Sequence, residues 1–455
     1  MTKRIIRVLA AATLSLLPAI YCHGAELEFR GNSLRVLSET PERNTGLDKI
    51  YIAYDMTGVS AVYHAADAAG VKCYRYSNLG GAYAEEVQVE KEGNDIVIPS
   101  TEGDMGYIVE EGDTRYYFWI VNYLPHRFSA TSLSEGEGSD CMSTRLRFEG
   151  EASPIYYYTI NGQQRVLSRE IHLEYETQEW DETQSAFVNT HVSKIYESLG
   201  ENVAVTPPPY CATYFTLTGD KFLTAWNWTQ TVESSTVQPQ AVAVETKAEQ
   251  DTADMGDDYQ SNQIKNNDAG GLGGSAPADI HFYAFATEGV LHHEWQMSRD
   301  ADFEEVEYRF NQQNLDYTFT EEGTFYLRYI GSNADGTCDA TGETYTVAIG
   351  ASELKCPNAF SPNDDGVNDE WKVAYRSILE FECWIYDRQG HEMAHLTSPD
   401  QGWDGKRGGK TVPPGVYFYV IRAKGSDGTD YKLSGDINII RRSSSGTSSG
   451  ADTAE

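Results

Sequence analysis

The sequence predicts an all-β protein made of tandem immunoglobulin-like β-sandwiches that are joined by a flexible acidic linker. Short runs of alternating apolar and polar residues recur, for example at Lys49–Tyr54 and Tyr116–Tyr123, and Gly, Asn and Asp separate them. Such runs are typical of half-buried strands. Aromatic residues make up 12% of the chain and include 30 Tyr, which favours strands further.

The first 25 residues have the layout of a cleaved signal peptide. Lys3, Arg4 and Arg7 precede the apolar run Val8–Ile20, which is shorter than the roughly 20 residues that a membrane span needs. Cys22 leaves a lipoprotein signal open as the alternative, although the bulky Tyr21 beside it is unusual for one. No later stretch is long and apolar enough to predict a membrane span.

Composition and turn signals divide the rest of the chain into folded units and spacers. Candidate strands predict a first sandwich with Trp119 on a central strand, and a second one that ends before a change in composition. The linker holds eight Asp or Glu, two Lys and a Gly-rich run, so its low apolar content predicts a flexible spacer. The predicted units are 26–145, 146–232, the linker 233–278, 279–352, 353–441 and a disordered Ser/Gly-rich tail, 442–455.

The net charge limits the kinds of partner that the protein can bind, and the number of cysteines indicates the compartment in which it folds. The net charge of −34 excludes nucleic acid as a main partner, because a phosphate backbone would be repelled. Apart from Cys22, six cysteines remain, an even number that predicts disulfides in an oxidising compartment. The sequence does not choose among their pairings. We expect Cys356 to bond Cys383, which would tie the entry loop of the last unit to its first long strand.

The last unit is the most strongly patterned part of the chain. It opens with a chain of Pro, Asn, Asp and Gly turns from Cys356 to Asp369, and strands follow. Five motifs stand in order: Pro357-Asn358-Ala359-Phe360-Ser361-Pro362-Asn363, Asp365-Gly366-Val367-Asn368-Asp369, Ile385-Tyr386-Asp387-Arg388, Trp403-Asp404-Gly405 and Pro414-Gly415-Val416-Tyr417.

These motifs resemble the gliding-motility-associated C-terminal domain, the type B sorting signal of Bacteroidetes type IX secretion cargo. The resemblance implies a β-domain that engages the secretion machinery, and a protein that is secreted or held on the outer surface of a Gram-negative bacterium. The preceding unit is similar to PKD-like domains, which commonly precede the sorting domain. That similarity rests on Trp295, Phe319, Gly323-Thr324-Phe325-Tyr326, Asn333 and Cys338.

One string in the last unit matches a catalytic pattern. His391-Glu392-Met393-Ala394-His395 reads as the H-E-x-x-H of zinc proteases. That chemistry requires a helix, because only there do both imidazoles face one metal ion. Gly390 and Ser398-Pro399 leave little room for a helix, so we expect surface histidines on a strand and turn and predict no enzyme.

The turn-rich loop of the last unit is a weak candidate for a Ca²⁺ site. Closely spaced carboxylate and amide oxygens are the ligands that Ca²⁺ takes, but capped turns explain the same residues without a metal. No other cofactor is expected. The candidate ligands are Asn363, Asp364, Asp365, Asn368 and Asp369.

Trp226 and Trp228 are the best candidates for an aromatic binding platform. Residues at i and i+2 of a strand share one face, and exposed rings stack on sugars or on protein partners. The alternative is that the strand face that carries these two residues is buried in a hydrophobic core.

The sequence as a whole predicts a non-catalytic secreted or cell-surface protein of structural or adhesive role. Its N-terminal sandwiches would contact an unknown surface protein or glycan, and its C-terminal domain would serve export or attachment. A glycan-binding surface protein is the alternative, and a metal-dependent hydrolase is the third hypothesis.

Overall fold

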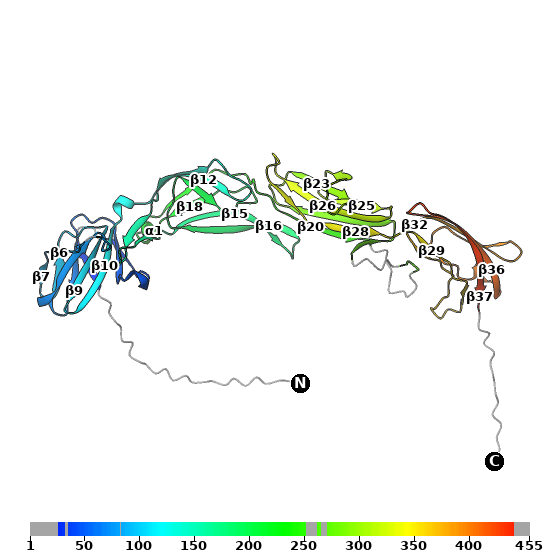
Figure 1. Cartoon of the computed structure of the whole chain (residues 1–455), viewed down its shortest axis with the longest axis horizontal. Coiled ribbons are helices and arrows are strands. Elements are labelled where there is room, and N and C mark those ends of the chain that lie inside the picture. The colour runs from blue at the N-terminus through cyan, green and yellow to red at the C-terminus, as the bar shows by residue number, and fades with distance from the viewer. Residues whose placement is uncertain (1–25, 32–34, 82, 252–261, 265–270, 441–455) are drawn as a thin grey trace, which may run out of the picture.

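The computed structural model arranges the chain as four β-sandwich units in sequence order along an extended, curved molecule (Figure 1). The expectation of an all-β fold of tandem sandwiches is therefore confirmed. The signal peptide predicted for residues 1–25 and the tail 442–455 lie outside the described residues. The structure describes residues 26–31, 35–81, 83–251, 262–264 and 271–440.

The first sandwich packs a four-stranded sheet on a six-stranded one. The smaller sheet has the order β1 (Leu27–Arg30), β4 (Ser60–His64), β8 (Asp95–Ile98), β7 (Glu90–Glu92). The larger sheet has the order β2 (Val36–Glu39), β3 (Lys49–Ala53), β10 (Thr114–Asn122), β9 (Met105–Glu111), β5 (Lys72–Tyr76), β6 (Glu85–Val87). Trp119 lies on β10, a central strand as expected.

The second sandwich begins earlier than the sequence indicated. Its strand β11 pairs with β12, so residues 129–145 belong to this unit and not to the first one. A single turn of helix, α1 (Lys221–Ala225), lies between its last strands. Its sheets are β11 (Ser129–Glu135), β12 (Thr144–Glu151), β17 (Asn202–Val205); β13 (Ile155–Tyr158), β14 (Gln164–Leu167); and β16 (Ala186–Tyr196), β15 (Ile171–Asp181), β18 (Thr216–Gly219), β19 (Gln230–Glu233).

The third sandwich includes strands from the segment that we expected to be a spacer. One sheet is β20 (Val244–Gln250), β22 (Ala278–Ala286), β25 (Leu315–Phe319). The other is β21 (Leu272–Gly274), β28 (Tyr345–Ile349), β26 (Gly323–Ser332), β23 (His292–Ser298), β24 (Tyr308–Phe310), with β27 (Asp339–Thr341) beside β26.

The prediction of a flexible linker over 233–278 is thus wrong for its described strands. β20 alternates half-buried Val244, Thr246 and Ala248 with exposed Glu245 and Lys247, and it pairs along its full length with β22. This period of two marks a half-buried strand. The acidic composition of the whole segment hid that local alternation, because every charge of β20 lies on its solvent face.

The fourth unit has a five-stranded sheet and two small ribbons. The sheet is β30 (Ala359–Phe360), β37 (Asp430–Ile439), β36 (Gly415–Gly425), β32 (Ile378–Tyr386), β33 (Glu392–Leu396). The ribbons are β29 (Glu353–Lys355) with β31 (Ala374–Arg376), and β34 (Lys406–Arg407) with β35 (Lys410–Thr411).

The first two sandwiches share a hydrophobic core. On β10, Phe118 and Ile120 face the core of the first sandwich, whereas Trp119 and Val121 face a core that continues into the second sandwich. Strand β3 alternates in the same way. A strand that is covered on both faces reads as a continuous apolar run, and Phe118–Val121 is such a run. The two units therefore form one body.

A fully buried ion pair lies where the chain passes from the first sandwich to the second. Arg169 Nε donates to Asp220 Oδ2 at 2.9 Å, and both side chains are 0% exposed. The other guanidinium nitrogens donate to the carbonyl oxygens of Ser153 (2.8 Å) and His126 (2.6 Å). Each nitrogen of this buried cation thus has a partner, which is the condition for such a pair to be tolerated.

Asp220 connects this pair to both sandwiches. Its Oδ1 accepts from the Tyr123 hydroxyl, at the end of the first sandwich, and from the Leu223 N–H, both at 3.0 Å. The second bond caps α1. Burial, followed by the nearby Asp220 carboxylate, raises the pKa of Tyr123, so its hydroxyl remains a donor at neutral pH.

A disulfide joins the second and third sandwiches. Cys141 bonds Cys338 across 197 residues of sequence, with a Cα–Cα distance of 5.5 Å. Near this joint the Glu288 N–H donates to Gln178 Oε1 at 3.0 Å, and the rings of Trp180 and Phe285 lie 5.2 Å apart. Contacts of this kind restrict relative motion of the two units, which would otherwise be the default between domains.

The predicted pair Cys356–Cys383 is not formed, since both are free thiols. Cys383 points into the core of the fourth unit, where burial raises the pKa of its thiol to about 12. The Cys356 thiol lies beside the Tyr419 hydroxyl, and its pKa is also raised by burial. The sequence offered no way to prefer a pair between different domains.

Replacing Arg169 with Met should lower the free energy of unfolding of the first two sandwiches by about 3–5 kcal/mol, because Asp220 would stay buried without its cation. Urea titration measures this. The double variant Arg169→Met, Asp220→Leu should lose less than the sum of the single losses. The exposed pair of Arg147 with Glu201 gives the control, since Arg147→Met should change stability by less than about 1 kcal/mol. An equally small effect of Arg169→Met would contradict a structural role for the pair.

Peptide mapping without reductant should recover one cross-linked peptide, containing Cys141 and Cys338. The variant Cys338→Ser should lose that peptide and melt at a lower temperature, because a cross-link over a long loop restricts the unfolded chain. Cys356→Ser should leave both the map and the melting temperature nearly unchanged. A peptide that joins Cys356 to Cys383 in fresh protein would refute the pairing given by the structure.

Candidate functional site

The turn-rich loop of the fourth unit is closed by its own hydrogen bonds. Asp369 Oδ1 accepts from the N–H groups of Asn363 (2.8 Å) and Asp364 (2.7 Å), and Oδ2 accepts from the Gly366 N–H at 2.7 Å. Asp364 and Asn368 have positive φ angles of 58° and 53°, which short polar residues tolerate better than others. The residue types of the loop are therefore those that its turns require.

The motifs that carried the sequence resemblance meet in the core beside this loop. Trp371 and Trp403 exchange backbone hydrogen bonds of 2.9 and 3.0 Å, and Trp371 Nε1 donates to the Pro357 carbonyl at 2.7 Å. The Trp403 ring packs against Phe360 and Tyr417 at 5.6 and 5.1 Å. These residues hold the loop and the two ends of the sheet together, so their role is structural.

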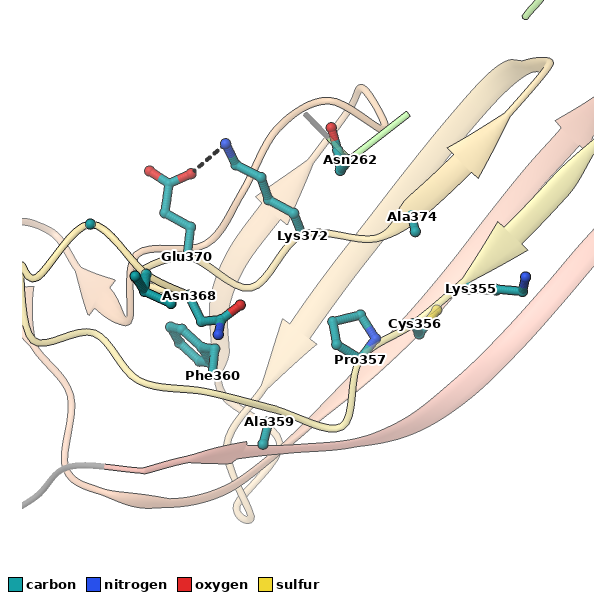
Figure 2. Close-up of a pocket in the computed structure, with 12 residues that line it drawn as sticks. Asn262, Lys355, Cys356, Pro357, Ala359, Phe360, Asn368, Glu370, Lys372 and Ala374 are labelled. Atoms are coloured by element: carbon teal, nitrogen blue, oxygen red, sulfur yellow. Dashed lines mark ion pairs between the residues drawn. The ribbon is translucent and has the colours of Figure 1, made fainter. Parts of the chain in front are cut away.

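A groove of about 700 Å³ lies between the loop and the β29–β31 ribbon. In Figure 2 the side chains of Glu370 and Lys372 lie above, with Asn368 just below Glu370, and Phe360, Pro357 and Ala359 lie on the segment of chain below them. Lys372 Nζ and Glu370 Oε2 form an ion pair of 3.1 Å. Cys356 also lines the groove, but its raised pKa keeps it a thiol, which is a poor nucleophile.

Part of the groove wall comes from the third sandwich. Asn262 Nδ2 donates to the carbonyl oxygens of Val373 and Pro399, both at 2.7 Å. The Tyr375 N–H donates to the Asn262 carbonyl at 2.9 Å, and the Ile264 N–H donates to the Tyr375 carbonyl at 2.7 Å. Residues 262–264 therefore lie alongside β31, and Gln263 forms a single parallel β-bridge with Tyr375. Nothing in the sequence indicated this contact, because the segment has the composition of a spacer.

A buried serine makes a second contact between these units. Ser377 Oγ donates to the Gly350 carbonyl at 2.6 Å and accepts from the Ala276 N–H at 3.1 Å, and the Ser377 N–H donates to Ser275 Oγ at 2.7 Å. The fourth unit is thus held at two points by the third, and one of them lies at the groove.

His391 and His395 lie on a turn and on β33, as expected, and not on a helix. His391 Nδ1 contacts Asp387 Oδ2 at 2.9 Å, whereas the His395 ring stacks on Trp384 at 5.0 Å. The two imidazoles therefore have different neighbours. Among the described residues no group of three or more His, Cys, Asp or Glu is placed to hold a metal ion. Whether the loop ligand set Asn363–Asp369 binds Ca²⁺ stays a prediction.

Trp226 and Trp228 do not form the predicted platform, because residues 226–228 follow α1 and are not a strand. Trp226 is buried in the core shared by the first two sandwiches. Trp228 is 40% exposed, but the Arg35 guanidinium lies 3.7 Å from its ring centroid and Tyr54 packs against it at 5.0 Å. The two rings fasten the joint between the sandwiches.

Asp369→Asn tests the loop closure. The backbone N–H groups, that of Asn363 first, lower the pKa of the Asp369 carboxyl, so its ionised form stabilises the folded state. This contribution is present above the ordinary aspartate pKa, about 3.9, and is lost as pH falls through the lowered value. The variant should melt a few degrees lower at pH 7, and the difference should vanish in acid. Asp364→Asn is the control, because that side chain makes none of these bonds. A difference that persists in acid would contradict the assignment.

Two segments of the chain match known protein families. Residues 132–234 match the fibronectin type III domain, and residues 354–438 match the CHU_C type IX secretion signal domain. No curated protein matches the chain.

Three solved structures are similar over much of the chain. Dimeric latent PorU from Porphyromonas gingivalis shares 9% identity over 72% of this chain and 35% of its own, with a TM-score of 0.15. The BSP domain of a biofilm-associated protein shares 9% over 85% and 93%, with a TM-score of 0.16. A Ca²⁺-stabilised adhesin of an Antarctic bacterium, which binds ice, shares 11% over 89% and 98%, with a TM-score of 0.19. These TM-scores establish no common arrangement.

Within the described part of the chain, no helix has the length and apolarity to cross a membrane. The second sandwich contains the segment that matches the fibronectin type III domain, and the turn-rich loop and the five-stranded sheet of the fourth unit lie in the segment that matches the secretion signal domain. The protein is therefore a secreted or surface-located chain of tandem β-sandwiches that ends in a type IX secretion signal domain.

Proposed function

We propose that the protein is a non-catalytic surface protein of adhesive or structural role. In this proposal the first three sandwiches form a stiff contacting arm, and the fourth engages the secretion machinery and then holds the arm at the cell surface. The observation that carries the proposal is the way the units are joined. Three units are connected by a shared core, a buried ion pair and a disulfide. A secreted enzyme does not need its domains held rigidly in this way.

Stiff joints favour a contact role for a physical reason. A flexible arm that binds a distant partner gives up conformational freedom on binding, and that loss weakens the complex. With fixed joints, the loss of conformational entropy occurs when the protein folds and not when it binds. The binding free energy of a contact made by the outer sandwiches is therefore reduced less. The joints of this chain combine apolar burial with a covalent bond, which is the combination that such an arm requires.

The alternatives receive less support. The glycan hypothesis relied on a shared face of Trp226 and Trp228, and one ring is buried while the other is covered by Arg35. The hydrolase hypothesis relied on helical His391 and His395, and β33 takes the place of that helix. Adhesion by the arm needs neither feature.

Fractionation of a bacterium that carries the type IX secretion system tests the export half of the proposal. The full chain should reach the cell surface or medium, and a chain without residues 354–438 should stay inside the cell envelope. A matched control, Asp364→Asn within the domain, should be exported normally. Export of the truncated chain would contradict the assigned role of the domain.

A cell-attachment assay with the purified full chain tests the contact half. Surfaces coated with the chain should capture cells or matrix that uncoated surfaces do not. Turnover of any substrate that accounts for the phenotype of a deletion strain would overturn the non-catalytic proposal.

A further inference from the structure

Strand β16 of the second sandwich has an unusually long unpaired flank. It has 11 residues, Ala186–Tyr196, and it is the terminal strand of its sheet, with β15 as its hydrogen-bonded neighbour. The next longest terminal strands in the described part of the chain, β11 and β20, have seven residues each. A terminal strand presents every second N–H and C=O away from its sheet. The flank of β16 is thus the largest such template on the arm.

The flank is open over most of its length. Near Ala186 the strand approaches β22 of the third sandwich, where Trp180 packs against both Phe187 and Phe285. From Val188 onward every residue is half-buried or exposed. Ile195 is 60% exposed, which is high for an apolar residue on a long strand.

The composition of β16 also sets it apart from other strand edges. Proteins usually guard edges with charge, Pro or bulges. β20 carries Glu245, Lys247 and Glu249, and β7 reads Glu-Lys-Glu. β16 has no Pro and no Gly, and it pairs with β15 in one unbroken register. In a chain with 69 Asp and Glu, it holds no carboxylate at all.

The ionisable side chains of β16 are basic. His191 already faces two acids of β15, with Nδ1 3.1 Å from Glu176 and Nε2 3.9 Å from Glu174. Lys194 lies opposite Leu173, and it makes no ion pair within the described residues. An incoming strand with carboxylates would therefore meet a cation that its own chain leaves unpaired, whereas elsewhere the acidic surface would repel it.

We propose that the β16 edge docks an extended acidic segment of a partner protein by strand addition. Backbone hydrogen bonds along Val188–Tyr196 would supply binding, and Lys194 would select acidic side chains. The inference rests on the proposed function, because it names the contact surface of the arm. The following experiment uses isolated components, so its failure leaves the export and attachment results standing.

A second copy of the chain fits this edge less well. Antiparallel pairing of two β16 strands about their centre would place His191 opposite His191 and Lys194 opposite Val188, and neither strand would bring a carboxylate to the pair. Each copy also carries a net charge of −34. Self-pairing is therefore an outcome that the experiment must be able to detect.

The test uses the full mature chain and a soluble peptide of about ten residues that alternates Thr and Glu, a pattern suited to one added strand. Hydrogen exchange should slow about tenfold or more at alternate amides within 186–196 on addition of the peptide. A peptide that alternates Thr and Lys should give no such protection. Binding should weaken as salt rises, because the selecting charges lie at the surface.

Variants separate this edge from general electrostatics. Lys194→Glu should weaken binding about fivefold or more, since an attractive cross-strand pair becomes a repulsive one, and Ile195→Glu should weaken it as well. Lys247→Glu, on the guarded edge of β20, should bind like the wild type. Melting curves confirm that each variant is folded.

Three results would overturn the proposal. The first is unchanged exchange over 186–196 at peptide concentrations in the millimolar range. The second is equal protection by the acidic and basic peptides. The third is a dimer in solution whose β16 amides are protected without peptide, which would make a second copy the occupant.

Discussion

The arrangement of the N-terminal half depends on the buried pair of Arg169 and Asp220. A buried charge is costly unless all of its hydrogen-bonding groups are satisfied, so the pair fixes the position of every group around it. These groups are the Ser153 and His126 carbonyls, the Tyr123 hydroxyl and the first turn of α1. They come from the end of the first sandwich, the connection and two parts of the second. An apolar core alone tolerates sliding, whereas this network has one satisfied geometry.

Each pair of neighbouring units is held together by a different kind of interaction. Apolar burial joins the first pair of units, a covalent bond joins the second pair, and backbone and serine hydrogen bonds join the third. The last joint includes the parallel bridge of Gln263 with Tyr375 and the hydrogen bonds of Asn262 and Ser377. This joint also borders the groove of the fourth unit.

Sequence reasoning recovered the class of the fold and the identity of the last domain, because both depend on local patterns. Alternating runs specify strands, and the turn residues of Pro357–Asp369 specify a loop that the structure closes through Asp369. It failed where one pattern has two physical causes. Trp226 and Trp228 at i and i+2 are neighbours on a strand, but here they follow a helix. Segment 233–278 has the composition of a spacer, but it contains β20. The strand was missed because its charged residues, which all lie on one face, contribute to the acidic composition of the segment.

The contacts between the units could not be predicted from the sequence, because they join residues that are far apart in the chain and that no local pattern connects. Arg169 and Asp220 lie 51 residues apart and were two charges among many. The run Phe118–Val121 did hold a signal, because a strand that is apolar on both faces must be covered on both. Interpreted as doubly buried, that run predicts a second unit packed against the first sandwich.

The disulfide can form only at a late stage of the assembly of the protein. Thiols stay reduced in the cytoplasm, so Cys141 and Cys338 can bond only after the chain has left it. Until then the second and third sandwiches are joined by Trp180, Gln178 and their partners alone. The disulfide therefore adds its covalent restraint to these contacts only outside the cytoplasm.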